Sequence, residues 1–235
     1  MPKIYIAAPF GNYISTKNTT SVIGTFTHKP RSGLILQILK TLRYDFQEKA
    51  WYNALGLRNP GILEGVRRYN NKSNQVLSIA AIDPQDYDYL NAIIPTSTKL
   101  EINISCPNIT HFEDYLKGLP QFQPRNPIIK LSPQIDDEVI DRLLHEGFTH
   151  FHASNTLKTY RGGRSGSILK PYTLKTIEYI RKRIGDKGRI IAGGGITNMN
   201  DIEEYIQGGA NDVSLGTVCF NLVKMRALVA ENGGL

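Results

Sequence analysis

The feature that most limits the possible folds is the alternation of short apolar runs with helical patterns from one end of the chain to the other. Eight runs have the length and the β-branched content typical of buried strands. They occupy residues 4–8, 22–27, 75–81, 100–105, 127–131, 150–154, 189–193 and 212–215. The clearest helical patterns between them occupy residues 136–146, 171–184 and 200–208. Such alternation predicts a parallel sheet covered by helices.

Eight such units in 235 residues predict an α/β fold of one particular kind, a compact (β/α)8 or TIM barrel that forms a single domain over residues 1–235. The competing architecture is a doubly wound open sheet, which normally carries a glycine-rich turn after its first strand. Here Ala-Pro-Phe-Gly-Asn (residues 8–12) follows the first strand, and the glycines cluster late in the chain. The barrel is therefore favoured, with its active site at the carboxyl ends of the strands.

One long connection, residues 29–74, interrupts this rhythm. It contains a helical stretch at residues 34–42 and the segment Trp-Tyr-Asn-Ala-Leu-Gly-Leu-Arg-Asn-Pro-Gly at residues 51–61. Connections of this length in compact domains usually have a function. Neither a repeat nor a linker in the sequence indicates a second domain.

Composition narrows the class of protein. Two cysteines, Cys106 and Cys219, are too few for a disulfide framework, so a reducing cytoplasm is expected, with Cys219 as a buried apolar residue. No apolar run approaches the roughly 18 residues of a membrane helix, and residues 1–10 lack the order of a secretion signal. The five histidines show no metal-ligand spacing. The net charge of +7 is compatible with a nucleic-acid surface, with anionic ligands or simply with solubility.

The end of the fourth predicted strand carries the densest chemistry. Residues 100–105 alternate apolar and polar side chains, and Pro107 ends the strand because it cannot donate to a sheet ladder. Asn103 and Asn108 flank Cys106 there. Two carboxamides and a thiol thus place donors, acceptors and a nucleophile or base at one strand end.

The late glycines predict the kind of ligand. Gly194 and Gly195 follow the seventh predicted strand, and Gly216 and Thr217 follow the eighth. Loops after the last two strands of barrels frequently bind phosphate through backbone N–H groups, and glycine lets a ligand approach the backbone. The alternative is a pair of ordinary tight turns.

Two further predicted strands carry residues that are unusual for a barrel. Lys130 interrupts an apolar strand, and a lysine there must be paired or used, for example to stabilise negative charge on a bound cofactor. Asn155 and Thr156 close the sixth predicted strand and add polar groups to the same end of the barrel.

Together these motifs resemble the dihydroorotate dehydrogenase family. The resemblance rests on Asn-Ile-Ser-Cys-Pro-Asn (103–108), Lys-Leu-Ser-Pro (130–133), Ser-Asn-Thr (154–156), Gly-Gly-Arg-Ser-Gly (162–166), Gly-Gly-Gly-Ile (193–196) and Leu-Gly-Thr (215–217). The segment 51–61 is similar to the substrate side of that family. The match runs in order through nearly the whole chain.

The resemblance implies a barrel that holds FMN and oxidises dihydroorotate to orotate in pyrimidine biosynthesis. Cys106 would be the base that removes the C5 proton while a hydride leaves C6 for the flavin. The implied substrate-binding residues are Asn53, Gly56, Leu57, Asn103, Asn108, Asn155 and Thr156. The implied flavin-binding residues are Lys130, Gly166, Gly194, Gly195, Gly216 and Thr217.

A cysteine at position 106 is similar to class 1 of the family, the soluble class, because the membrane-bound class has serine there. This class, together with the absence of an amino-terminal hydrophobic anchor, implies a cytoplasmic protein and suggests a homodimer. The final electron acceptor stays open between fumarate, NAD through an iron–sulfur partner subunit, and oxygen.

Two departures from the family pattern are visible. Gly24 stands where the family usually has a lysine near the flavin, and either Lys17 or Arg164 is hypothesised to replace that cation. The segment 109–116 is shorter than the mobile loop of the family, which predicts poorer shielding of the site from water.

Two other functions are considered. One is a tRNA-dihydrouridine synthase, a similar FMN barrel for which the charge of +7 would suit RNA. About 18 residues after Thr217 leave no room for the helical RNA-binding domain of that family, so nucleic acid is not expected as a partner. The other is a degenerate barrel that binds flavin or pyrimidine without turnover, which Gly24 supports.

Overall fold

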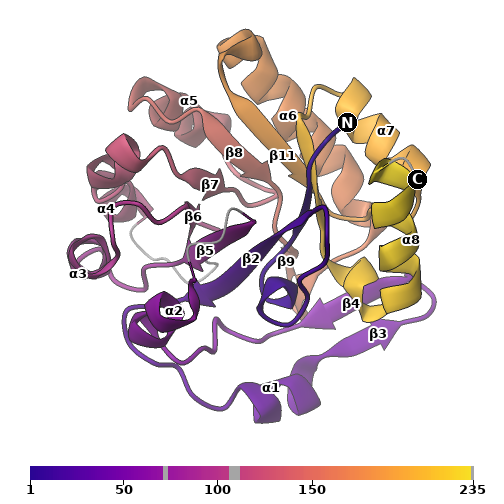
Figure 1. Cartoon of the computed structure of the whole chain (residues 1–235), viewed down its shortest axis with the longest axis horizontal. Coiled ribbons are helices and arrows are strands. Elements are labelled where there is room, and N and C mark those ends of the chain that lie inside the picture. Colours follow the sequence, from indigo (N-terminus) through magenta and orange to yellow (C-terminus); the bar gives the residue numbers. More distant parts are fainter. Residues whose placement is uncertain (71–73, 106–111, 234–235) are drawn as a thin grey trace.

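The computed structural model describes residues 1–70, 74–105 and 112–233. Its central feature is a closed barrel of eight parallel strands, in the order β1-β12-β11-β8-β7-β6-β5-β2 (Figure 1). The strands are β1 (Ile4–Ile6), β2 (Thr19–Phe26), β5 (Gln75–Ile79), β6 (Leu100–Asn103), β7 (Ile128–Lys130), β8 (His150–Ala153), β11 (Arg189–Gly193) and β12 (Asp212–Leu215). The predicted (β/α)8 barrel and all eight predicted strands are therefore confirmed.

Helices cover the outside of the barrel in the described part of the chain. They are α2 (Ile62–Arg68), α3 (Asp86–Ile93), α4 (Phe112–Lys117), α5 (Asp137–His145), α6 (Lys170–Ile184), α7 (Met199–Gln207) and α8 (Leu222–Gly233). The predicted helical ranges at 136–146, 171–184 and 200–208 agree with α5, α6 and α7 to within one residue. After β1 the chain forms a short 3₁₀ turn, Phe10–Asn12, in place of a helix.

The barrel strands are buried on both faces, because helices cover the outer face and the strands themselves enclose the inner one. All four residues of β6 are buried, including Glu101 with 0 % exposure. The apolar and polar alternation of this strand therefore separates an outward face packed under helices from an inward face on the barrel axis. Its polar residues are buried in the barrel and do not face water.

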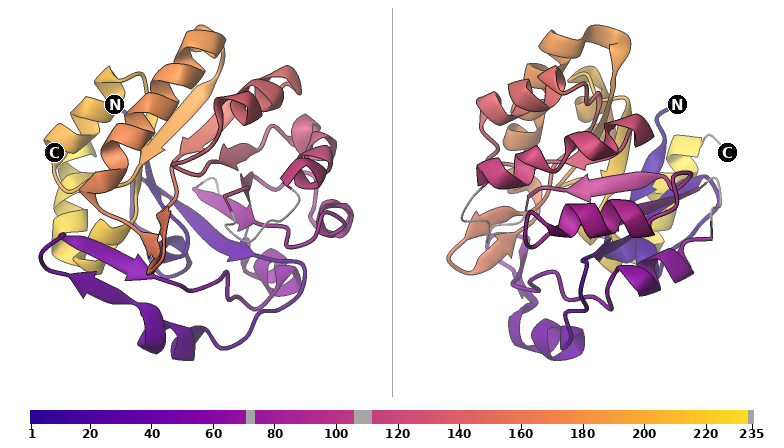
Figure 2. Two further views of the ribbon diagram at one scale, coloured as in Figure 1. Left: turned by 180° about the vertical axis from the view of Figure 1, so that it is seen from behind. Right: turned by 90° about the vertical axis from the view of Figure 1, so that its left-hand side faces the viewer.

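A second sheet of four antiparallel strands, which the sequence analysis did not predict, lies against the barrel. Its order is β3-β4-β10-β9. The strands are β3 (Arg43–Asp45), β4 (Ala50–Asn53), β9 (Leu157–Thr159) and β10 (Gly162–Arg164). In the right-hand view of Figure 2, the β9–β10 hairpin lies at the end of the barrel opposite the two chain termini. Asn53 pairs with Gly163, which joins the long connection to the loop after β8.

Helix α1 (Leu34–Thr41), predicted at residues 34–42, stands apart from the helices that cover the barrel. None of its residues is buried, and Ile35, Leu36 and Leu39 are exposed. Figure 1 places α1 below the barrel, on the side of β3 and β4. None of the described helices combines the length and the apolarity that crossing a bilayer demands.

Candidate active site

A cavity of about 1040 Å³ opens at the carboxyl ends of the barrel strands. Residues from the ends of the barrel strands form its floor and one wall, and β4 with the segment after it forms the opposite wall. Of the predicted site residues that the structure describes, every one but Gly166 lines this cavity, namely Asn53, Gly56, Leu57, Asn103, Lys130, Asn155, Thr156, Gly194, Gly195, Gly216 and Thr217. The barrel thus brings together groups that lie far apart in the sequence.

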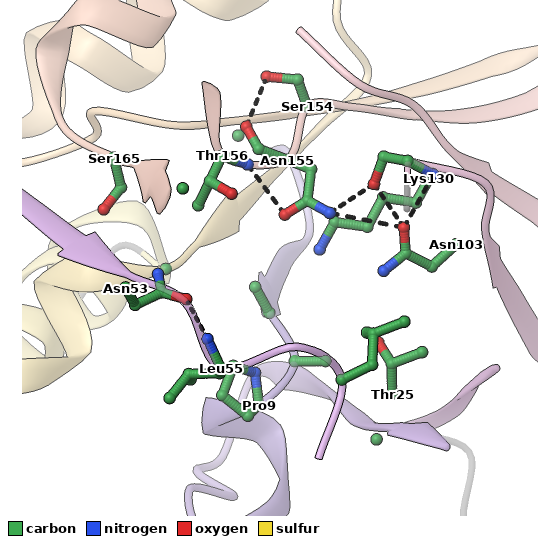
Figure 3. Close-up of a pocket in the computed structure, with 18 of the residues that line it drawn as sticks. Pro9, Thr25, Asn53, Leu55, Asn103, Lys130, Ser154, Asn155, Thr156 and Ser165 are labelled. Atoms are coloured by element: carbon green, nitrogen blue, oxygen red, sulfur yellow. Dashed lines mark hydrogen bonds between the residues drawn. The ribbon is translucent and has the colours of Figure 1, made fainter. Parts of the chain in front are cut away.

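A cluster of amide and hydroxyl groups occupies one wall (Figure 3). Asn103 Oδ1 accepts hydrogen bonds from the N–H of Ser105, at 3.1 Å, and from its hydroxyl. Asn155 Nδ2 donates to Ser105 Oγ and, at 3.5 Å, to Asn103 Oδ1. The N–H of Thr156 donates to Asn155 Oδ1 at 2.9 Å. The two carboxamides are therefore held in place by β6, β8 and the residues directly after them.

Asn53 reaches the cavity from the second sheet. It is the last residue of β4, and its Oδ1 faces the N–H of Leu55 at 3.5 Å. The chain then turns through Gly56 and Leu57, with φ values of +64° and +53°. The carbonyl of Gly56 accepts a hydrogen bond from Arg31 Nε at 3.1 Å, which ties this turn to the start of the long connection.

Cys106 and Asn108 lie outside the described residues. Ser105, which directly precedes Cys106, lines the cavity. The roles that the resemblance implies for Cys106 and Asn108 therefore stay predictions.

The predicted phosphate turns lie at another edge of the cavity. Gly194 and Gly195 have φ values of +102° and +72°, and a Cβ on Gly195 would come within 2.9 Å of the Gly166 carbonyl oxygen. Tyr205 donates to the Gly194 carbonyl at 2.6 Å and fixes the turn. Within the described residues, the N–H groups of Gly195 and Thr217 have no protein acceptor. Unpaired N–H groups on a cavity wall suit an anion.

Gly166 is a different case, because it is not among the residues that line the cavity. Its backbone lies behind the wall, against Gly195 and against Ala50 of β4. A side chain at this glycine, whose φ is +117°, would press on the Lys49 carbonyl and on Ala50 at the start of β4.

The floor of the cavity holds a buried polar network that the sequence analysis did not identify. Glu101 accepts hydrogen bonds from Ser78 Oγ at 2.8 Å and from His152 Nδ1 at 2.7 Å. Lys130, 4 % exposed, is paired in register with His152 across β7 and β8. The one sequence signal that could have revealed this network is the recurrence of polar residues at inward positions of adjacent strands.

The charges in this network can be assigned from their surroundings. Burial alone would raise the pKa of Glu101, but the Lys130 ammonium and the hydrogen bonds from His152 and Ser78 outweigh it and lower the pKa to about 2. Burial, with a smaller effect from Lys130, lowers the pKa of His152. Near neutral pH the floor therefore holds an ionised Glu101 carboxylate beside a neutral His152 imidazole.

Position 24 has no room for the lysine that the family usually carries there. Gly24 has a φ of +121°, and a Cβ would lie 2.4 Å from the Ser78 carbonyl oxygen. Asn12 holds the glycine from both sides, because its side chain donates to the Gly24 carbonyl and accepts from the Gly24 N–H. Neither proposed replacement reaches the cavity wall: Lys17 is exposed in the turn before β2, and Arg164 pairs with Glu48 at 3.2 Å.

The expectation that Cys219 is a buried apolar residue is confirmed. Cys219 is buried, and burial raises the pKa of its thiol to about 12, so it is an apolar core residue. Among residues 1–70, 74–105 and 112–233, no group of three or more histidine, cysteine or acidic side chains is arranged to hold a metal ion.

Comparison with known proteins identifies the family. The chain is 30% identical over 215 residues to the dihydroorotate dehydrogenase B (NAD(+)) catalytic subunit of Staphylococcus carnosus, with 77% of this chain and 70% of that protein covered. This chain belongs to the dihydroorotate dehydrogenase family. The subunit of the same name from Bacteroides thetaiotaomicron is 25% identical, with 90% of this chain and 79% of that protein covered.

Further comparisons agree with this membership of the dihydroorotate dehydrogenase family. The family profile described as dihydroorotate dehydrogenase matches residues 144–231. Among solved structures, the ligand-free type DHODH from Eimeria tenella superposes with a TM-score of 0.73 at 20% identity, over 91% of this chain and 78% of that one. At this identity the superposition supports the fold, which is the barrel described above.

Proposed function

We propose that this chain oxidises dihydroorotate to orotate with FMN as its cofactor, with Cys106 as the base. The observation that carries the proposal is that one cavity joins three elements: the amide cluster around Asn103 and Asn155, the buried Lys130, and the open N–H groups of the late glycine turns. Each element suits one part of a complex between a pyrimidine and a flavin nucleotide.

The cavity fits FMN in both size and chemistry. Its volume of about 1040 Å³ is at the upper end of the range for cofactor sites, which leaves room for a substrate beside the cofactor. Gly195 and Thr217 would hold the phosphate through their N–H groups, and Lys130 would lie against the ring system from the barrel floor. When bound, FMN would supply a two-electron acceptor for hydride.

The amide cluster suits a cyclic imide. Each carboxamide offers both a donor and an acceptor, which matches the alternating N–H and C=O groups of dihydroorotate. Asn103 and Asn155 are held by one hydrogen bond to each other and by hydrogen bonds to Ser105, so they would bind with little loss of conformational entropy. Asn53 would meet the same ligand from the opposite wall. Gly56, Leu57, Asn108 and Thr156 would complete the substrate site.

The chemistry needs one proton acceptor near C5 of the substrate. We assign this role to Cys106, because it is the next residue in the sequence after Ser105, and Ser105 lines the cavity. A thiol with an ordinary pKa near 8.5 is only a few per cent ionised at pH 7, so the rate should rise with pH up to about that value. A reducing cytoplasmic setting would keep this thiol free, and a homodimer is the assembly we expect.

The proposal is tested with the purified, FMN-loaded chain under anaerobic conditions. Dihydroorotate should bleach the flavin absorbance, and Cys106→Ala should keep the yellow colour but lose the bleaching. Cys219→Ala is the matched control, since it removes a thiol that is buried away from the cavity, and it should bleach at the wild-type rate. A wild-type protein that binds FMN but is not bleached would instead be a binding barrel without turnover, and reduction of RNA substrates alone would indicate a dihydrouridine synthase.

A further inference from the structure

A chain of hydrogen bonds crosses the inside of the barrel beneath the cavity. It runs from Thr25 Oγ1 to Ser78 Oγ at 3.0 Å, from Ser78 to Glu101 at 2.8 Å, and from Glu101 to His152 Nδ1 at 2.7 Å. This series of hydrogen bonds therefore links β2, β5, β6 and β8. Glu101 and His152 are 0 % and 2 % exposed, so this network is shielded from bulk water and its interactions are strong.

His152, at one end of this series of hydrogen bonds, faces the cavity. Because His152 Nδ1 donates to the Glu101 carboxylate, the neutral imidazole carries its free lone pair on Nε2. Nε2 has no hydrogen-bond partner within the described residues, and it lies 3.2 Å from where a Cβ on Gly193 would be. Ser214 Oγ, next to the same glycine, is buried and has no hydrogen-bond partner among residues 1–70, 74–105 and 112–233. His152, Gly193 and Ser214 all line the cavity, so two unsatisfied polar groups face the ligand space.

The charged groups on the cavity floor provide no spare positive charge for a cofactor that becomes negative when it accepts hydride. Among the described residues that line the cavity, Lys130 is the one cation buried in the floor, and Glu101 already balances its charge. Four other cations among the described residues line the cavity away from the floor: Arg31 and Arg58 bind carbonyl groups of the long connection, Arg68 pairs with Glu64, and Lys158 of β9 is exposed. A hydride delivered to a neutral ring brings two electrons and one proton and therefore adds one negative charge, which is costly in a buried site.

We propose that His152 takes up a proton when the flavin is reduced and so supplies the positive charge that balances the reduced ring. This inference rests on the proposed function, because it requires that FMN binds in the cavity. The second proton comes from water, so reduction of the loaded protein consumes two electrons and two protons. His152 is a positioning and charge-balancing residue in this scheme, and Cys106 keeps the role of base toward the substrate.

The groups that face His152 are compatible with this role. Glu101 of β6 favours the protonated form, whereas Lys130 of β7 and burial oppose it, which keeps the imidazole neutral before reduction. Beneath them, Tyr5 of β1 stays neutral because burial, with Asp212, raises its pKa to about 12, and Asp212 is paired with Arg189 at 2.6 Å. New negative charge above the floor would oppose the effect of Lys130 and shift the balance toward protonation.

The test is the pH dependence of the flavin midpoint potential in the FMN-loaded full chain, from about pH 6 to about pH 8.5. A two-electron couple shifts by about 30 mV per pH unit for each proton taken up. The midpoint potential of wild type should fall by about 60 mV per pH unit at the acid end of this range. At the alkaline end it should fall by about 30 mV per pH unit, because His152 no longer takes up a proton when the flavin is reduced. His152→Asn, whose amide can still donate to Glu101, should show about 30 mV throughout.

Two controls make the outcome decisive. His150→Gln removes a histidine from the same strand that does not line the cavity, and it should keep the wild-type slopes. His152→Gln replaces His152→Asn if the latter unfolds at a lower urea concentration than wild type. Equal slopes in wild type and the His152 variants, or about 30 mV throughout in wild type, would overturn the inference. Failure of wild type to bind FMN would refute the proposed function as well, and that result is seen before any potential is measured.

Discussion

The barrel and the four-stranded sheet at its mouth contribute to the same cavity but are built differently. The barrel strands are buried on both faces, and the charges inside them are fully enclosed, as in the Glu101–His152 contact. The four-stranded sheet joins residues 43–53 to residues 157–164 and relies on partly exposed contacts. Arg161 lies 4.0 Å above the Tyr52 ring and pairs with Asp45 at 3.0 Å.

The difference indicates a division of labour. The barrel holds Lys130, Asn103 and Asn155, which would contact the flavin and one side of the substrate. These polar groups lie at the ends of buried strands, where an unpaired charge would cost much free energy. The sheet brings Asn53 from the opposite side on a strand whose residues alternate between buried and half-buried and whose neighbouring ion pair is partly exposed. Substitutions in the barrel should therefore affect stability first, and substitutions in the sheet should affect ligand affinity first.

The largest expected effect comes from Glu101→Ala. Removing the carboxylate leaves the Lys130 charge buried without a counter-ion and Ser78 without its acceptor, which should lower the free energy of unfolding by about 3–5 kcal/mol. Urea denaturation of the ligand-free protein measures this loss. Glu48→Ala, which removes an exposed carboxylate in the turn between β3 and β4, is the comparison, and a similar loss there would contradict the distinction between the two regions.

Gly24→Ala should have the next largest effect. The added Cβ would meet the Ser78 carbonyl at 2.4 Å with the backbone at a φ of +121°, which should cost about 1–3 kcal/mol of stability. Gly216→Ala is the matched control, because a Cβ there meets no atom of the described residues within 4 Å. It should leave the urea midpoint unchanged and weaken FMN binding, if Gly216 approaches the phosphate. An unaffected Gly24→Ala would show that the barrel can adjust at this point.

Acid should destabilise the barrel through the same buried groups. The pKa of His152 is lowered in the folded state, so the unfolded chain binds more protons as the pH falls below about 6.5, and stability decreases with it. The loss from His152 should begin below about pH 6.5, and the loss from Glu101 should follow below about pH 4.5. Thermal unfolding across this range should show a flatter profile near pH 6 in His152→Asn than in wild type.

The same two regions mark what could be predicted from the sequence. The eight barrel strands were found because each is a local apolar run, and the predicted site residues of the barrel lie at strand ends or directly after them. The second sheet was missed because no local pattern reveals that residues 43–53 pair with residues 157–164. Glu101 and His152 were missed as functional candidates because polar residues in an alternating strand normally indicate a solvated face, whereas in a closed barrel that face is the interior.

Residues 19–21 show the same limitation on a smaller scale. Strand β2 begins at Thr19, three residues before the predicted start. Thr19 and Ser21 are polar but buried, and their hydroxyls bond to the carbonyls of Thr16 and Ile14. These bonds depend on the turn that precedes the strand, so composition alone gave no signal for the earlier start.

Arg161→Ala is expected to have the smallest effect on stability and to be the most informative test of the four-stranded sheet. The side chain is exposed and its ion pair is screened by water, so the urea midpoint should not change measurably. Its contact with the Tyr52 ring nevertheless fixes the strand that ends in Asn53, and loosening that strand should weaken orotate binding by up to about tenfold.

Arg183→Ala provides a control with the same chemistry elsewhere. Arg183 on α6 pairs with Asp141 at 2.5 Å and lies 3.4 Å above the Tyr179 ring, and none of these three residues lines the cavity. Orotate affinity, measured from the spectral change of the bound flavin, should be unchanged in Arg183→Ala and reduced in Arg161→Ala. Equal affinities in both variants would mean that Asn53 is positioned by the barrel, and the proposed division of labour between the two regions would be wrong.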